Sequence, residues 1–276
     1  MSAVGTPTTN TASASSSSVA VTKPTGLAVD DLMLAQVMTR DTVNGPTTPN
    51  TPTGWTIAYT TSIGGVGYIV FRKLADSADA AASTFTFSGG SGTNRIIASM
   101  AKFSNVDTVA PINASNSAAS TDSPMTTGGV TPTIQSMFVI LGALYVGAGG
   151  SRTVSGYSVV TSNPTWTEAF DVNDSNAHLS MAYAGDRTAI TATGTASATV
   201  NASGTNNSLG ILALSPSVVR PASLAGALIV NNVTIPFVAQ SISALLTVVE
   251  PVIVIVANKW SNIQKNVSAW LNPPKS

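Results

Sequence analysis

The chain lacks cysteine altogether, and this absence excludes several kinds of site. Disulfide bonds, thiolate nucleophiles and cysteine-ligated zinc all require a cysteine side chain. Charged residues are also scarce, at 9% of the 276 residues, against about 25% in an average soluble domain. Long surface helices usually carry i,i+4 pairs of Glu and Lys, and this chain has too few charges to form them. The composition therefore disfavours a helical protein.

An excess of basic residues is missing as well. Lys and Arg number 12, Asp and Glu also number 12, and the formal net charge is zero. Without a basic excess to neutralise phosphate groups, we expect no nucleic-acid partner. A neutral chain repels its own copies weakly, which permits self-association. Hydrophobic residues still make up 43%, and with abundant Ser, Thr, Asn and Gly they favour β-sheets with neutral polar faces around a real core.

A membrane-spanning segment is not expected either. The apolar stretch at residues 242–257 is shorter than the ~20 residues that a spanning helix needs, and Glu250-Pro251 interrupts it. Its last part, Val252 to Val256, contains only β-branched residues, which favour strands. We therefore predict two buried strands here. The segment from Met1 to Ser18 shows neither the basic start nor the apolar run of a signal peptide.

Short hydrophobic segments broken by Gly, Pro and Asn dominate the middle of the chain. Several of them alternate at period 2, the spacing of a strand with one buried face. The segments that we predict as strands are residues 31–37, 54–59, 68–73, 84–87 and 97–103. The sequence therefore predicts an all-β fold that is nearly free of helix between residues 23 and 215.

The strand pattern then returns. Four blocks recur in the same order and at similar offsets; they are 32–36 and 137–141, 53–56 and 164–167, 68–73 and 179–184, and 92–103 and 204–214. This repeat indicates two similar halves, at about residues 27–107 and 130–216. They form either one sandwich of facing half-sheets or two small sandwiches in tandem, and we favour one jelly-roll-like sandwich.

The two ends differ from this β-sandwich, which we place at residues 23–216. Residues 1–22 are rich in Ser and Thr and are predicted to form an N-terminal arm. Residues 217–276 are strongly apolar, and one sandwich cannot bury all of their apolar surface. They are predicted to be a β-rich oligomerisation or attachment segment. The residues that we assign to its interface are Phe237, Val252, Ile253, Ile255, Trp260 and Trp270.

The sequence offers few candidates for chemistry. His178 is the only histidine, and Asp171 and Asp174 just before it could converge with it on a metal ion. We favour a turn instead, because Asp is common in turns for its local hydrogen bonds. Glu168 and Asp186 could form the carboxylate pair of a glycosidase, but nothing in their spacing fixes the required separation. We therefore predict no catalytic residue, no metal site and no cofactor.

Two tryptophans occupy equivalent places in the repeat. Trp55 and Trp166 each begin a strand after a turn that contains proline. We favour a packing role in the core or at its rim for both. The alternative is that they stack on sugar rings, which makes them the candidate glycan contacts.

Several motifs together resemble a β-sandwich family of tailed-bacteriophage structural proteins. The resemblance covers about residues 20–215, and it is carried by the runs Lys23 to Ala35, Pro52 to Trp55, Tyr68 to Ala75, Thr84 to Ser88, Phe103 to Asp107 and Ala110 to Ile112. The members of that family decorate capsids, form head fibres or build tail appendages, and some bind carbohydrate. No catalytic residue is carried over.

The resemblance implies a virion structural protein on the particle exterior, which fits a capsid decoration or head-fibre component. It would self-associate, by our expectation as a homo-trimer, and bind other virion proteins such as the major capsid protein. The alternative is a glycan-binding tail appendage that recognises surface glycans. Neither role needs a membrane or a nucleic acid.

Overall fold

The structure is a computed structural model of the chain. It describes residues 3–146, 152–174, 176–187, 190–201 and 206–217, and the backbone of four strands between residues 225 and 257. The chain divides into two compact units, Met1–Val218 and Val219–Ser276, here called the body and the C-terminal unit. The all-β prediction is confirmed, because the described residues contain one helix, the five-residue α1 (Ser77–Ala81).

The first half of the body is built on a large antiparallel sheet. Its strand order is β1-β8-β3-β6-β5, with the short β4 (Gly45–Pro46) paired to the end of β3. The strands are β1 (Thr8–Ala14), β3 (Leu32–Asp41), β5 (Thr56–Ile63), β6 (Val66–Leu74) and β8 (Arg95–Phe103). A small outer sheet of β2 (Ser18–Thr22) and β7 (Thr84–Ser88) belongs to the same half.

The second half repeats this arrangement. Its large sheet has the order β9-β16-β11-β14-β13, which matches β1-β8-β3-β6-β5 strand for strand. The strands are β9 (Ile112–Ser120), β11 (Ser136–Tyr145), β13 (Thr167–Asp174), β14 (Ala177–Arg187) and β16 (Asn206–Leu214). Its outer sheet has three strands, β10 (Met125–Thr127), β15 (Ala196–Val200) and β12 (Val154–Val159), in the order β10-β15-β12.

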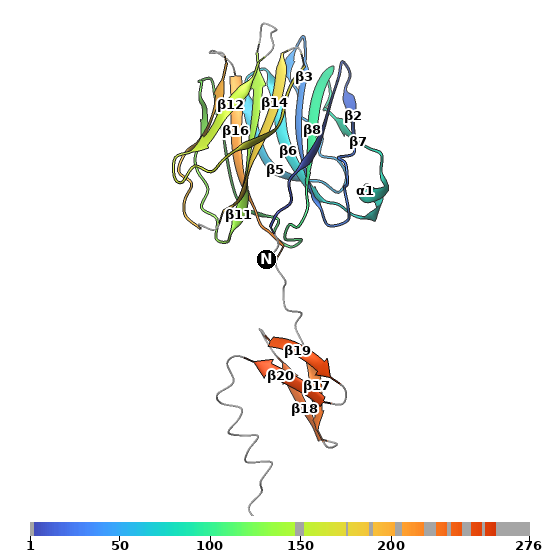
Figure 1. Ribbon diagram of the computed structural model, residues 1–276. Helices are drawn as coiled ribbons and strands as arrows, with labels where there is room; N and C mark the ends of the chain where they lie inside the picture. Colours follow the sequence, from blue (N-terminus) through green and yellow to red (C-terminus); the bar gives the residue numbers. More distant parts are fainter. Residues whose placement is uncertain are drawn as a thin grey trace, which may run out of the picture. The chain divides into compact units, whose positions relative to one another are not determined.

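The two large sheets face each other across a central core (Figure 1). β5 lies against β9, and β1 lies against β13. These contacts are equivalent, because β1 corresponds to β9 and β5 corresponds to β13. The halves therefore face each other reciprocally, as two subunits of an isologous dimer do. The facing half-sheets and the two small sandwiches that the repeat suggested are thus present in one body.

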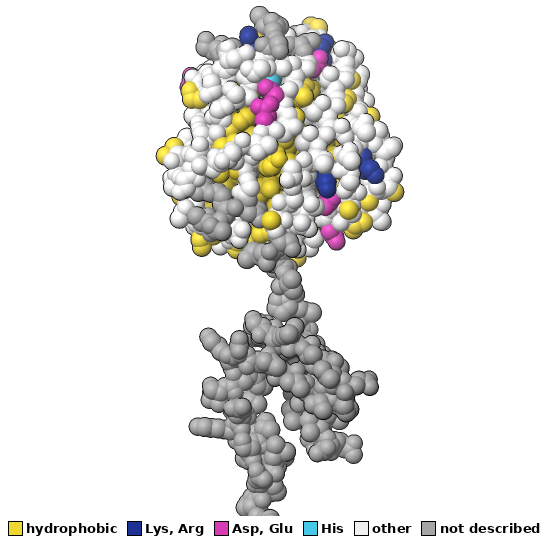
Figure 2. Space-filling view, viewed as in Figure 1, with side chains coloured by type: hydrophobic (Ala, Val, Ile, Leu, Met, Phe, Trp, Pro, Cys, Tyr) yellow, Lys and Arg dark blue, Asp and Glu magenta, His cyan; other side chains and the backbone are white. Residues whose placement is uncertain are grey.

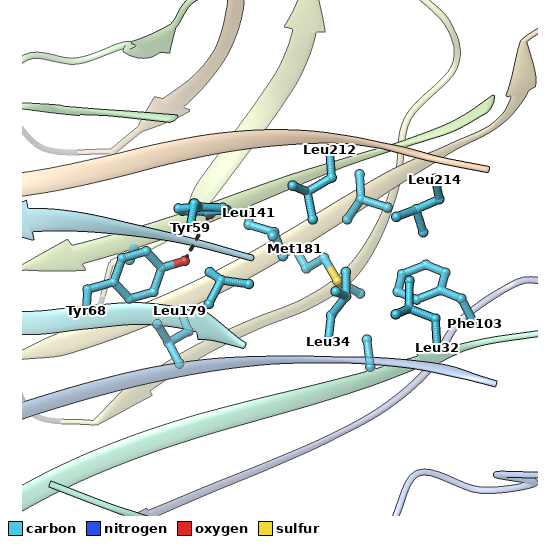
Figure 3. Packing of buried hydrophobic residues seen from close by; sticks show 14 of the residues in the cluster. Leu32, Leu34, Tyr59, Tyr68, Phe103, Leu141, Leu179, Met181, Leu212 and Leu214 are labelled. Carbon is cyan, nitrogen blue, oxygen red and sulfur yellow. Dashed lines mark hydrogen bonds between the residues drawn. The ribbon is translucent and has the colours of Figure 1, made fainter. Parts of the chain in front are cut away.

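Strand alternation divides the hydrophobic residues among three cores. In β3, Leu32, Leu34 and Met38 point into the central core, while Met33 and Val37 point toward the outer sheet of the first half. Both faces of the large sheets are covered, which explains their long apolar runs. In the central core, leucines of the second half such as Leu212 and Leu214 pack near Leu32 and Leu34 (Figure 3).

One buried hydrogen-bond chain crosses the central core. The Tyr59 and Tyr68 hydroxyl groups lie 3.3 Å apart (Figure 3), and Tyr68 donates to Gln36 Oε1 at 2.6 Å. Gln36 Nε2 then donates to the backbone oxygen of Ser180 in the opposite sheet at 3.0 Å. The chain satisfies a buried amide and links the two halves at a defined register.

The expectation of an N-terminal arm is wrong. β1 pairs with β8, and β2 pairs with β7, so both segments are strands of the body within their own chain. The physical reason is visible in β2, where Val19 and Val21 alternate with exposed residues and enter the outer core. β1 is an edge strand, and its Ser and Thr side chains suit a partly exposed face.

The C-terminal unit contains two separate antiparallel hairpins. One joins β17 (Ala225–Val230) to β18 (Val233–Val238), and the other joins β19 (Ala244–Val249) to β20 (Val252–Ala257). In the second hairpin Val249 pairs with Val252, so two strands lie on either side of the break that the sequence predicts. Among the described residues, no helix is long and apolar enough to cross a membrane.

Candidate functional site

The candidate chemical residues of the sequence gather on the outer face of the second half. Asp171 and Asn173 on β13 lie opposite Ser180 and His178 on β14, so the four residues share one face of the hairpin. Glu168 of β13 and Tyr157 of β12 lie close enough to interact electrostatically with this group. We call these six residues the β13–β14 polar cluster.

The hydrogen bonds of the cluster orient the His178 ring and assign a hydrogen to its Nδ1 atom. Asn173 Nδ2 donates to the Arg152 backbone oxygen and its Oδ1 accepts from the Arg152 N–H, at 2.9 and 3.0 Å, so the orientation of this amide is determined. Asn173 Oδ1 also lies 2.9 Å from His178 Nδ1, which must therefore be the donor. The other ring nitrogen, Nε2, faces the Asp171 carboxylate.

The same side chains hold β12 to the body. Asp171 Oδ2 accepts from the Val154 N–H at 3.1 Å, and Asn173 brackets the Arg152 backbone. Arg152 shortly precedes β12, and Val154 is its first residue. The cluster therefore fixes the start of the third strand of the outer sheet.

Burial and like charge perturb two acids of the cluster. Partial burial and the nearby Asp171 carboxylate raise the pKa of Glu168, and His178 opposes this effect. Burial raises the pKa of Tyr157; the Ser180 hydroxyl acts against it, and the Glu168 and Asp171 carboxylates add to it. Both shifts favour the neutral acids.

These contacts hold structure around a buried histidine. His178 is only 1% exposed, its Nδ1 lies 2.9 Å from Asn173 Oδ1, and its Nε2 faces the Asp171 carboxyl group. Asp174 does not join the group, because its carboxylate pairs with Arg95 at 3.0 Å. The described residues contain no cluster of three or more His, Asp or Glu side chains that could hold a metal ion. The Asp186 side chain lies outside what the structure describes.

The two tryptophans occupy different environments. Trp55 is 8% exposed, and the rings of Phe85 and Phe87 contact it edge-on, with centroids 6.2 and 5.5 Å away. The ring therefore packs in the outer core of the first half, as the packing role requires, and the glycan role of Trp55 stays a prediction. Trp166 is half-buried, and its indole N–H donates to Asn163 Oδ1 at 2.9 Å.

The interface residues predicted in the C-terminal unit are placed only in part. Phe237 lies in β18, opposite Gly226. Val252, Ile253 and Ile255 lie in β20, opposite Val249, Val248 and Leu246. Trp260 and Trp270 lie outside the described residues.

A second polar site was not anticipated from the sequence. Arg40, near the end of β3, and Arg95, at the start of β8, are direct cross-strand neighbours. With Asp174 and Asn176 from the β13–β14 turn region, they line a recess at one end of the central core, here called the arginine recess. Arg40 and Arg95 lie far apart in sequence, so only the strand register brings them together.

In comparisons with known proteins, no family model, no curated protein and no solved structure matches the chain.

Proposed function

We propose that this chain is a structural protein of a virus particle, of the capsid-decoration or head-fibre type. The body is displayed on the particle exterior, and the C-terminal unit attaches it to sister copies and to the shell. The observation that carries this proposal is the pair of isolated, apolar hairpins in the C-terminal unit.

Two-stranded hairpins of this kind need a partner. A single hairpin is at best marginally stable in water, and the two hairpins here belong to separate sheets. Every residue of β20, from Val252 to Ala257, is apolar. Covering each large apolar side chain would contribute about 1.5–3 kcal/mol, and the open strand edges could pair with neighbours.

In the described part of the body, the most exposed large hydrophobic residues do not follow one another along a strand. Its large exposed hydrophobic residues are Val29, Val43, Ile57, Val109, Val160 and Ile190, and they come from separate strands and loops. The face shown in Figure 2 carries few charged side chains, in keeping with the scarcity of charge in the sequence. Self-association is therefore expected through the C-terminal unit.

The motifs that resemble those of the phage family have structural roles in the body. Asp31 Oδ2 accepts from the Ala28 N–H at 2.9 Å and lies 3.5 Å from Lys102 Nζ. Asp107 Oδ1 accepts from the N–H groups of Val109 and Ala110. Motifs that serve turns and packing support a structural protein better than an enzyme.

The proposal is tested by comparing the full chain with a chain that ends at Val218. This end point keeps the hydrogen bond from the Ser217 N–H to the Asn105 backbone oxygen at 2.7 Å, so the body remains closed. Sedimentation should show a homo-oligomer, expected to be a trimer, for the full chain and a monomer for the shortened one. Circular dichroism should show that the shortened chain keeps the β structure of the body.

A full chain that sediments as a monomer, or a shortened chain that keeps the oligomeric mass, would place the interface elsewhere. As a finer control, Ile253→Lys with Ile255→Lys changes two positions on one face of β20 and should also reduce the mass. Electron microscopy of intact particles with a labelled antibody then tests the location. Absence of the label from the particle surface would reject the virion role even if the protein oligomerises.

A further inference from the structure

The turn between β3 and β4 contains the only Asn-Gly pair of the sequence, Asn44-Gly45. An asparagine that precedes glycine is prone to lose its side-chain amide, because glycine has no side chain to hinder attack of its backbone nitrogen on the asparagine Cγ atom. Gly45 has a φ of +100°, in the left-handed region that glycine adopts readily. The pair therefore lies in a turn whose backbone depends on the same glycine.

The turn is open around the reacting atoms. Asn44 is exposed, and the preceding Val43 is 84% exposed. A Cβ atom added at Gly45 would meet no atom within 4 Å other than those of its chain neighbours, so the space beside this backbone is free. Hydroxide, which removes the amide proton of Gly45, and water, which completes the reaction, therefore have access to the pair.

The carboxylate of Asp41 organises the turn. The Asp41 side chain is mostly buried, at 7% exposed, and its Oδ1 accepts from the Val43 N–H at 2.8 Å. Its Oδ2 accepts from Asn44 Nδ2 at 2.5 Å, and the amide must be the donor because an ionised carboxylate offers only acceptors. The hydrogen bonds from Val43 and Asn44 hold the pKa of Asp41 below its usual value.

We propose that Asn44 is a deamidation site and that its conversion loosens the β3–β4 turn. The Gly45 nitrogen loses its proton to base and attacks Asn44 Cγ, so a C–N bond forms and the side-chain nitrogen leaves as ammonia. Water then opens the resulting succinimide ring at one of its two carbonyl carbons, which leaves isoaspartate or aspartate. The chain loses one ammonia and gains one water, and no oxidant or reductant is needed. This modification is independent of the proposed attachment through the C-terminal unit.

Neither product can keep the hydrogen bonds of the turn. Aspartate places a second carboxylate against Asp41 where a donor stood, so a hydrogen bond is exchanged for repulsion between like charges. Isoaspartate also carries the chain through the side-chain carbon, which adds one backbone atom to the turn. The two strands pair Arg40 with Pro46 and Asp41 with Gly45, a register that the extra atom disturbs. Because ammonia is lost, the extent of conversion records the age of the molecule.

The proposal is tested by ageing the folded full chain in a mildly alkaline buffer made with heavy-oxygen water. Each ring opening then incorporates the label, which separates deamidation during the incubation from earlier change. Mass spectrometry of peptides gives the rate at each asparagine, and the fragment masses distinguish isoaspartate from aspartate. Asn44 should deamidate at least tenfold faster than Asn50, the matched control, which is also exposed but is followed by the β-branched Thr51.

Variants separate the reaction from its consequence for the turn. Asn44→Gln should slow the reaction at least tenfold, because the longer side chain must close a larger ring. Asn44→Asp mimics one product, and Asn44→Ala removes the donor without adding charge. By NMR titration, the pKa of Asp41 should rise in Asn44→Ala, which loses a hydrogen bond, and should rise further in Asn44→Asp, which adds a like charge. Thermal melting of each variant confirms that it is folded.

Three results would overturn the proposal. They are labelling of Asn44 no faster than that of Asn50, loss of the Asn44 amide only after the chain has been unfolded with denaturant, and a pKa of Asp41 in Asn44→Asp that is no higher than in Asn44→Ala. Either of the first two would show that the folded turn protects the amide. The third would show that the turn accommodates the new charge.

Discussion

The two halves of the body share a scaffold and differ in what they place on its outer face. Both have the same strand order, and both have a register irregularity at the same place, between Ile57 and Tyr59 in β5 and between Glu168 and Phe170 in β13. Trp166 also corresponds to Trp55, because each lies immediately before one of these two strands. The structure thus allows each residue of one hairpin to be compared with its counterpart in the other.

The outer core of the first half is filled with aromatic rings. Phe85 and Phe87 of β7 enclose Trp55. The corresponding strand of the second half, β15, contributes the small residues Ala196 and Ala198 instead. The additional strand β12 then supplies Tyr157. In the second half this third strand helps to cover the outer face of the large sheet, which Phe85 and Phe87 help to cover in the first half.

The β13–β14 polar cluster replaces uncharged residues of the first half. When the two hairpins are aligned on Trp55 and Trp166, Asp171 corresponds to Thr60, and His178 corresponds to Gly67. A Cβ atom at Gly67 would collide with the Thr47 backbone oxygen, so the first half has no room for a side chain there. Apart from the hydrogen-bond chain of Tyr59, Tyr68 and Gln36, the central core that both halves share is apolar on both sides, whereas the outer faces of the two halves differ.

The largest effect is expected where the first half relies on aromatic filling. Phe87→Ala should lower the free energy of unfolding by about 3–5 kcal/mol, because it removes a buried ring and leaves a cavity beside Trp55. Chemical denaturation at neutral pH, followed by tryptophan fluorescence, measures the change. Val43→Ala is the control, since Val43 is 84% exposed and its truncation should stay within about 0.5 kcal/mol. Equal effects would contradict the role given to the aromatic residues.

A smaller effect is expected from the polar cluster of the second half. Asp171→Ala should cost about 2–4 kcal/mol, because it leaves buried His178 and the Val154 N–H without their acceptor. Asp171→Asn should cost less, since the amide can still accept from Val154 and can donate to His178 Nε2. Denaturation curves of both variants provide the measurement.

The first half supplies the matched control for this substitution. Thr60 occupies the equivalent position, and its hydroxyl donates to the Tyr68 backbone oxygen at 3.3 Å. Thr60→Ala should therefore cost no more than about 1 kcal/mol, the usual net contribution of a neutral hydrogen bond. If Thr60→Ala were as costly as Asp171→Ala, the cluster would not distinguish the two halves.

The sequence predicts the fold better than it predicts the sites. Short apolar runs between Gly and Pro breaks identify β3, β6 and β8, and period-2 alternation of covered and exposed positions identifies β7. β1 and β2 are missed because their Ser- and Thr-rich composition is also that of a linker, and only the two valines of β2 indicate a buried face. The sequence repeat predicts that the two halves are similar. It does not predict the reciprocal packing of their sheets, because that packing depends on contacts between strands distant in sequence.

The two polar sites show why side-chain clusters are harder to predict. Asp171 and His178 are close in sequence and meet across a hairpin. Asp174 is equally close, but it lies an odd number of positions after Asp171 on β13, so its side chain leaves by the other face and points toward Arg95. Arg40 and Arg95 meet only through the register of β3 and β8, which no local pattern specifies.

Carboxyl groups give the finest comparison, because their pKa values shift in opposite directions in the two halves. In the first half, the backbone N–H of Asp79 lowers the pKa of Asp76, burial opposes this, and Lys73 adds to the lowering. In the second half, partial burial and Asp171 raise the pKa of Glu168. The Asp76 carboxylate therefore stabilises the fold above its unfolded pKa, and this stabilisation is lost as the pH falls through its folded pKa. The protonated Glu168 carboxyl stabilises the fold below its unfolded pKa, and this stabilisation is lost as the pH rises through its folded pKa.

The smallest effect follows from this contrast in sign. The folded chain holds the Glu168 proton more tightly than the unfolded chain does. The free energy of unfolding therefore falls as the pH rises from the unfolded pKa of Glu168, near 4.5, to its higher folded pKa. Glu168→Gln should therefore raise the free energy of unfolding at pH 7, by about 0.5 kcal/mol or less because the side chain is exposed. The gain should vanish near about pH 3.5, where the carboxyl is protonated in both states.

Asp76→Asn keeps a good helix N-cap and should instead reduce the free energy of unfolding at pH 7, with a smaller loss in acid. Denaturation of the three chains at both pH values measures the signs, and a gain from Glu168→Gln that is equal at both would show that charge is not its cause.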